Sequence, residues 1–220
     1  DKARQAAPGT VRTFGRAVSL RDFEDTALMA GEVAKASATW VWSGERRAIH
    51  LTIAAQGGAT FSADGLRRIA ATLLSERDPN HKLLIDNYSA VAVLVDASII
   101  VDDRYVTADV LAAARAALEL ELAFDRRRFG QPVYLSEIFA VLQNVGGVMA
   151  VDVNTLDLKS TDAAFRAAHG IDPALGQPQP HLRMLPARPG GSGAVLPAEL
   201  ARLEVPAQDL VLRATGGMSL

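Results

Sequence analysis

The spacing of apolar residues predicts a first set of helices and strands that would form one small domain. Ser19 and Asp22 stand three residues apart, as in a capping box, and an apolar stripe follows them. Ser62 precedes a second stripe with apolar residues at helical spacing. Between and after these helices every second residue is apolar, which is typical of strands with one buried face. The expected elements are helices over 19–30 and 62–75 and strands over 33–42, 47–54 and 83–86.

A second set of elements follows. In residues 91–101, both the odd and the even positions are apolar apart from Asp96 and Ser98. This pattern predicts a central strand covered on both faces. Thr107 is expected to cap a helix over 107–122. After a loop over 125–131, another capped helix is expected to end at Gly146-Gly147 and to lead into a strand over 148–153.

The composition changes after about residue 160. Five closely placed prolines precede the run Gly190-Gly191-Ser192-Gly193, which predicts an extended arm over 161–220. Leu210 and Leu212 make a terminal strand over 209–214 apolar enough to add to the sheet edge of a neighbouring domain or subunit, so both are candidate interface residues. In that case, deleting residues 190–220 should leave the rest of the chain folded.

Two parts of the sequence match each other when one is shifted by 115 residues. Leu20 then pairs with Leu135, and Val33 pairs with Val148. The match indicates either a duplicated α/β unit or the shared features of any two capped amphipathic helices. Either way, the elements predict an α+β fold of two small α/β sandwich units, each a ferredoxin-like variant, with an extended C-terminal arm. The expected domains are 1–13 as an N-terminal extension at a truncated end, 14–88 and 89–160 as the two units, and 161–220 as the arm.

Composition and charge exclude several classes of protein. Apolar residues make up 49% of the 220 residues, which is enough to build cores and argues against general disorder. The net charge of −2 excludes a broad basic surface for nucleic acid. The absence of cysteine excludes disulfides and cysteine-based metal sites. No apolar stretch approaches the roughly 18 residues needed to span a bilayer, so membrane insertion is not expected.

The motifs of common enzymes are missing, so the sequence predicts no catalytic residue, cofactor or metal site. There is no HExxH pair, no phosphate loop and no GxSxG turn. His50, on the polar face of a predicted strand, is expected to be solvated or hydrogen-bonded. One alternative is a small hydrolase or transferase with a site assembled from scattered residues, favoured by a deep polar pocket joining several of them. Its contributors would be Asp64, Asp86, Asp102, Asp103 and His81.

Two groups of side chains are candidates for contacts with other proteins. Trp40 and Trp42 share one strand face, and they either fill the core under the first helix or form an exposed interface anchor. The triplet Arg126-Arg127-Arg128 belongs either to a solvated loop or to a contact with an acidic partner.

Four short segments, in a fixed order, carry a family resemblance. They are Arg16-Ala17-Val18-Ser19-Leu20-Arg21-Asp22-Phe23-Glu24, Leu84-Ile85-Asp86-Asn87, Phe129-Gly130-Gln131-Pro132-Val133 and Val195-Leu196-Pro197-Ala198-Glu199-Leu200. Together they resemble the baseplate J-like family of contractile tails, roughly from Phe14 onward. Members of that family are usually longer, so we expect an N-terminal portion to be absent here.

The resemblance implies a structural, non-enzymatic baseplate wedge protein of a contractile phage tail or phage-tail-like injection system. It implies contacts that link wedges around the hub, with other copies of the chain or a related wedge subunit and with other baseplate, hub or sheath proteins. It implies assembly in the bacterial cytoplasm, without nucleic acid or membrane insertion. An adaptor domain from an unrelated complex is a further possibility, which only the family likeness disfavours.

Overall fold

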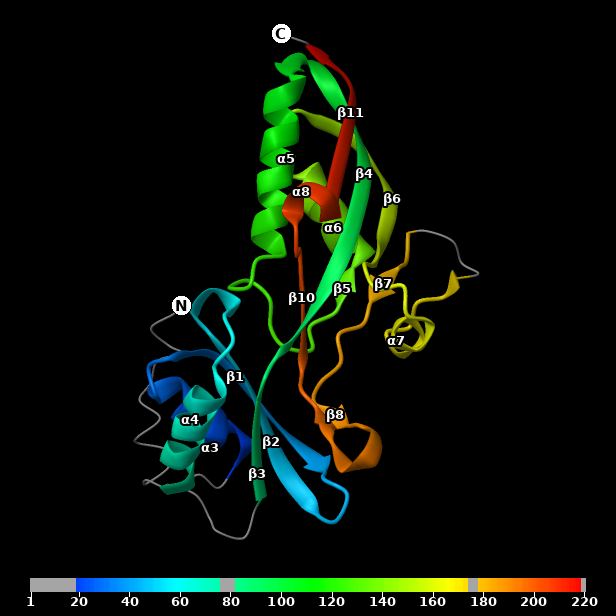
Figure 1. The fold of residues 1–220 in the computed structure, drawn as a ribbon. Helices are drawn as coiled ribbons and strands as arrows, with labels where there is room; N and C mark the ends of the chain where they lie inside the picture. Colours follow the sequence, from blue (N-terminus) through cyan, green and yellow to red (C-terminus); the bar gives the residue numbers. More distant parts are fainter. Residues whose placement is uncertain (1–18, 76–81, 174–177, 219–220) are drawn as a thin grey trace. The chain divides into compact units, whose positions relative to one another are not determined.

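The computed structural model describes residues 19–75, 82–173 and 178–218, which divide into two compact units (Figure 1). The first unit contains Asp1–Ser89 and Pro186–Glu199, and the second contains Ala90–Leu185 and Leu200–Leu220. The protein is α+β, as predicted, because each unit combines a sheet with helices. The ferredoxin-like detail stays a prediction. The expected extension over 1–13, the helix stop at 78–80 and His81 lie outside the described residues.

The first unit is a three-stranded sheet with two helices on one face. Strands β1 (Val33–Trp42) and β2 (Arg47–Ala55) form an antiparallel hairpin, and β3 (Lys82–Asn87) lies parallel to β2. Helices α3 (Leu20–Met29) and α4 (Ala63–Ser75) bury their apolar stripes against one face of this sheet, and the short turn η1 (Gln56–Gly58) follows β2. The core residues they share with β2 are Phe23, Ala27, Ile69, Leu73, Ile49, Leu51 and Ile53.

Local signals set the ends of these elements. The Ser19 hydroxyl accepts a hydrogen bond from the N–H of Asp22 (3.3 Å), and the Asp22 carboxylate accepts one from the N–H of Ser19 (2.8 Å). Gly31, directly after the helix, has a φ of 76°, a conformation that glycine adopts without strain. The predicted helices and strands of this unit are therefore confirmed, with ends that differ by one residue at most.

The second face of β2 is also buried, which the alternation in the sequence did not predict. His50 and Thr52 are both fully buried on that face. Residues 186–199 return to this unit, where β8 (Arg188–Pro189) and β9 (Val195–Leu196) pair around the turn η3 (Gly191–Gly193). The N–H of Ala198 donates to the Thr52 hydroxyl (2.9 Å), so this returning segment contacts the second face of the sheet.

The second unit is a four-stranded sheet centred on β4. Strand β4 (Ser89–Val106) pairs antiparallel with β6 (Val148–Leu158), parallel with β11 (Leu210–Met218), and also with β10 (Glu199–Arg202). Helices α5 (Thr107–Glu121) and α6 (Leu135–Gln143) pack against β11 and β6. The apolar face is continuous through the core residues Val95, Ala97, Ile99, Val110, Leu118, Ile138, Leu142 and Leu210.

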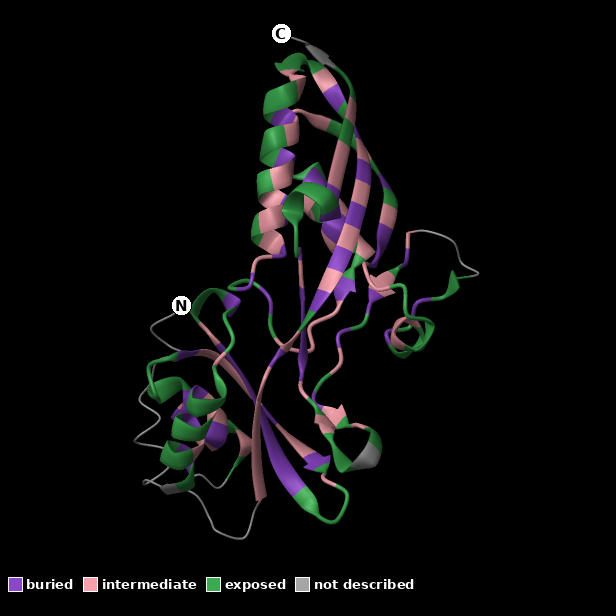
Figure 2. Ribbon diagram, in the orientation of Figure 1, coloured by how far each residue is buried: buried purple, intermediate pink, exposed green. Residues whose placement is uncertain are grey.

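The expectation that β4 is covered on both faces is wrong. Its residues alternate between buried and less buried, visible as bands in Figure 2, and Ile100 on the open face is 49% exposed. Asp96 lies on the same face and accepts hydrogen bonds from Asn154 (3.1 Å) and Arg213 (2.5 Å). Polar residues at alternate positions of β4 therefore keep its second face in contact with solvent, although other residues on that face are apolar.

Residues 161–220 are shared between the two units, which differs from the separate arm expected from composition. Helix α7 (Ala163–Ala168), strand β7 (His181–Leu182) and helix α8 (Pro206–Asp209) belong to the second unit, and β7 pairs with β5 (Val133–Tyr134). The terminal strand exists, but it adds to β4 of the same chain. Proline and glycine content predicts extended chain and does not say which sheet that chain joins.

Candidate functional site

Three of the acidic residues proposed for a scattered enzyme site, Asp64, Asp86 and Asp102, are each bound to a neighbouring side chain. Asp64 forms an ion pair with Arg67, one helical turn further along α4. The side chain and backbone N–H of Arg104 donate to Asp102, and these hydrogen bonds lower the pKa of that carboxyl to about 2. Among the described residues, no group of three or more histidine, aspartate or glutamate side chains could hold a metal ion.

His50 and Asp86 form a histidine–carboxylate pair that sequence reasoning did not foresee. The imidazole Nε2 lies 2.8 Å from Asp86, and Nδ1 lies 3.4 Å from the Thr52 hydroxyl. This order of groups is that of a nucleophilic triad. Thr52 and His50 are fully buried, however, and the hydroxyl already accepts a bond from Ala198, so no substrate can reach it. The cluster instead satisfies polar groups under the returning segment.

The two tryptophans have different environments. Trp40 packs against the core of the first unit, with the guanidinium of Arg47 4.3 Å from its ring centre. Trp42 is 57% exposed near the end of the hairpin, where its indole N–H donates to the carbonyl of Gly44 (3.0 Å). Trp42 therefore fits the interface hypothesis, and Trp40 fits the core hypothesis.

The arginine triplet is also divided. Arg126 and Arg128 are exposed, whereas Arg127 is fully buried. The Arg127 guanidinium donates to the carboxylate of Glu137 (2.7 Å) and to the carbonyl of Pro132 (2.6 Å). Arg127 is thus a structural residue that holds the 125–132 loop to α6, and only its two neighbours are accessible to a partner.

Leu210 and Leu212, the remaining interface candidates, face the core of the second unit. Leu210 is fully buried beside Val95, and Leu212 packs against the same core from the next position on that face. Of the two expected places for this strand, a neighbouring domain or another subunit, the structure shows the first, because β4 in the expected domain 89–160 forms the sheet edge that it joins.

Among the pockets lined by described residues, two lie within the second unit, and neither of these two is lined by an acidic candidate. One, of about 180 Å³, is bordered by the end of α5 and by Arg202, Leu203 and Pro206. The other, of about 210 Å³, lies where β5 meets β7. Both are smaller than the roughly 300–1,000 Å³ of typical small-molecule sites.

Within the described ranges, no helix is long and apolar enough to cross a membrane.

A buried carboxylate organises the turn before β11. Asp209 accepts hydrogen bonds from the N–H groups of Val205 (2.7 Å) and Glu204 (2.8 Å), and its other oxygen lies 3.1 Å from the ammonium of Lys159. Burial raises the pKa of Asp209, but the bonds from Val205, Lys159 and Glu204 together outweigh it and hold that pKa below its usual range. Asp209 thus fixes the chain direction into β11.

Replacing Asp209 by asparagine is expected to cost about 2 kcal/mol of unfolding free energy at neutral pH, since charge-assisted bonds are lost. The folded-state pKa is the lower one, so the stabilisation is complete above the unfolded-state value of about 3.9 and is lost as pH falls through the folded-state value. Urea unfolding at pH 7 and pH 3 should therefore show a smaller difference at pH 3. Glu204→Gln, at an exposed carboxylate, is the control; a pH-independent difference for Asp209→Asn would contradict this account.

Comparison with known proteins finds similarity both to a family model and to solved structures. Residues 15–86 match the family model described as the baseplate J-like central domain. A chain of the cryo-EM structure of the anti-feeding prophage (AFP) baseplate, 6-fold symmetrised, has a similar fold, with a TM-score of 0.56 at 16% sequence identity. The similarity covers 91% of this chain and 40% of that chain, so this chain spans less than half of its length. No curated protein sequence matches significantly.

Proposed function

We propose that this protein, whose residues 15–86 match the family model of the baseplate J-like central domain, is a structural component of the baseplate of a contractile phage tail or a related injection machine. The family match carries the proposal, because it spans the sequence from α3 to β3 and so includes both helices and all three strands of the first sheet. The fold similarity to a baseplate chain extends over both units and agrees with it.

In finer detail, the role would be that of a wedge subunit that links neighbouring wedges around the hub. Its partners would be copies of itself or a related wedge subunit, and other baseplate, hub or sheath proteins. Trp42 is suited to such a contact, because it is exposed and its indole is held in place by Gly44. Arg126 and Arg128 supply exposed cations for an acidic partner.

We further infer a role without catalysis, without nucleic acid and without insertion into a membrane, in a particle assembled in the bacterial cytoplasm. Supporting this, Asp64 and Asp102 are engaged by arginines, and the imidazole of His50, which is bound to Asp86, is fully buried. The overall net charge of −2 also disfavours a phosphate-binding surface.

The test is assembly with the sheath, tube and hub proteins of a contractile particle. Particles made with the full-length protein should carry it at the baseplate end, and particles made without it should lack baseplates. Trp42→Ala should leave the fold intact and reduce complete particles at least about tenfold, since losing an interface tryptophan costs about 2 kcal/mol or more. Met29→Ala, at a residue that is 51% exposed in the same unit, is the matched control.

Electron microscopy counts of complete particles provide the measurement. Normal assembly in the absence of the protein would refute the baseplate role. Equal counts for Trp42→Ala and Met29→Ala would leave that role standing and would remove Trp42 from the interface.

A further inference from the structure

The pocket where β5 meets β7 has a donor-rich lining that the structural role has not used. Its volume is about 210 Å³, and both strands that form it belong to the second unit. Its lining residues are Gly130, Pro132, Tyr134, His181, Arg183 and Met184.

The pocket is held rigidly by the core beneath it. Val133 pairs with Leu182 across the two strands, and both side chains are fully buried. Alternation along the strands then turns Tyr134 and His181 away from the core, with their ring centres 6.1 Å apart. The N–H of Leu135 donates to the carbonyl of Pro180 (3.0 Å), which ties the start of α6 to the same strand. The backbone pairing therefore holds the side chains of Tyr134 and His181 in place at the pocket.

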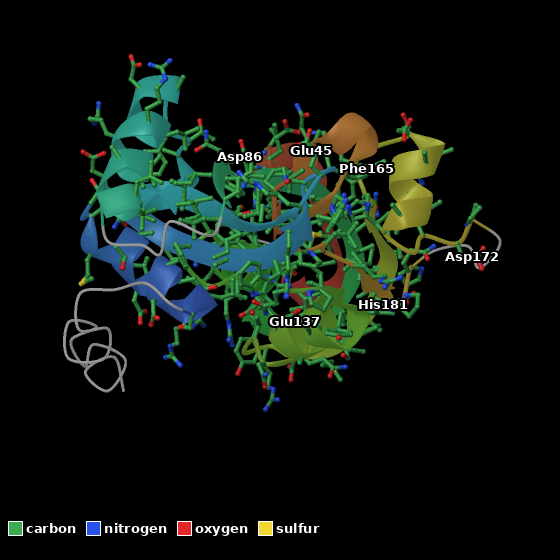
Figure 3. All side chains as sticks on the ribbon, turned by 90° about the horizontal axis from the view of Figure 1, so that it is seen from below. Glu45, Asp86, Glu137, Phe165, Asp172 and His181 are labelled. Atoms are coloured by element: carbon green, nitrogen blue, oxygen red, sulfur yellow. The ribbon has the colours of Figure 1, made fainter. Side chains whose placement is uncertain are left out.

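The pocket carries positive charge that its surroundings do not neutralise. Arg183 is exposed, and within the described part of the chain its side chain forms no ion pair. Glu137, on the first turn of α6, is already bound by the buried Arg127. Figure 3 labels Glu137 and His181. Arg128 is also exposed, on the turn closed by its own N–H and the side chain of Gln131 (2.9 Å).

We propose that this pocket receives a carboxylate side chain from an acidic segment of a neighbouring protein in the assembly, an inference that rests on the proposed function. A guanidinium binds a carboxylate through two parallel hydrogen bonds, so Arg183 is the anchor. The hydroxyl of Tyr134 and the imidazole of His181 supply further donors, and Met184 contacts the apolar stem of the incoming side chain.

An acidic peptide fits this site better than nucleic acid does. The pocket is small enough to be filled by one side chain, and the one arginine in its lining is Arg183. A nucleic-acid strand needs a line of cations that follows its phosphates, and a chain with a net charge of −2 offers no such general attraction.

The binding test uses the full 220-residue chain and a fluorescein-labelled hexaglutamate peptide, followed by fluorescence anisotropy at low salt. We expect weak, saturable binding. Arg183→Gln should weaken it about tenfold, because a charge-assisted bidentate contact is lost. Arg46→Gln is the matched control, because it removes the same charge from an exposed arginine in the first unit and should bind the peptide like the unchanged protein. Thermal unfolding of both variants verifies that they are folded.

Three results would overturn the proposal. They are the absence of saturable binding up to millimolar peptide, equal affinity of the Arg183 and Arg46 variants, and tighter Arg183-dependent binding of a hexathymidine oligonucleotide than of the peptide. Each can occur while the protein still enters baseplates, so failure of this inference is distinguishable from failure of the proposed function.

Discussion

Arg127→Gln is expected to destabilise the second unit by about 3 kcal/mol, because removing one partner of a buried ion pair leaves the other uncompensated. The Glu137 carboxylate and the Pro132 carbonyl would both lose a charged donor. Glu121 adds to the cost. Burial raises the pKa of Glu121, and the neighbouring Glu137 raises it further, so two carboxylates, one on α5 and one on α6, already lie close together. Urea unfolding followed by circular dichroism measures the change.

The adjacent arginines provide the control for this experiment. Arg126→Gln and Arg128→Gln make the same chemical change at exposed positions, where we expect changes within about 0.5 kcal/mol. Equal unfolding midpoints for all three variants would mean that the Arg127 ion pair contributes no more than a surface pair does.

The triplet also illustrates where sequence reasoning reaches its limit. Arg126, Arg127 and Arg128 are the same residue type in consecutive positions, and periodicity alone gives none of them a partner. The buried position is decided by Glu137, which is ten residues away and is brought close by the fold of the 125–132 loop. Glu137 lies in the first turn of α6, where a carboxylate is favoured as part of the helix cap. The same carboxylate is the partner of Arg127.

Local patterns were sufficient for most of the secondary structure. Capping residues, glycine stops and apolar stripes act over a few residues, and they placed α3, α4, β1 and β2 within one residue. The internal match shifted by 115 residues is also visible, because α3 and α6 begin at Leu20 and Leu135, and β1 and β6 begin at Val33 and Val148. These positions are predicted by both explanations for the match, which are duplication of an α/β unit and the shared features of any two capped amphipathic helices.

Long-range pairing was not predictable in the same way. His50 is buried by a segment that begins 136 residues later at Pro186, and the pocket near His181 is formed by two strands of only two residues each. Neither strand is long enough to show a period. The alternation His181-Leu182-Arg183-Met184 was the available signal, since Leu182 and Met184 are buried and Arg183 is exposed.

Deleting residues 190–220 is expected to unfold the second unit, which reverses the outcome expected from composition. The deletion removes β11 and all of β10 from the sheet, together with Ala201 and Leu210 from the core. It also removes Ala198, whose N–H binds Thr52, so the second face of β2 in the first unit loses its cover. Circular dichroism and proton NMR of the truncated chain should show the loss of most native tertiary signals.

Two single substitutions on β11 test how much its buried side chains contribute to stability while the strand itself is kept. Leu210 is fully buried against Val95, whereas Val211 points to the other face beside Asp96 and is only partly buried. Leu210→Ala should therefore cost about 2–5 kcal/mol, and Val211→Ala about 1 kcal/mol or less. The difference arises because the first substitution leaves a cavity in the core and the second mainly exposes a partly solvated face. If the truncated chain keeps native spectra and the two substitutions cost the same, β11 is an accessory strand, and the sheet around β4 is stable without it.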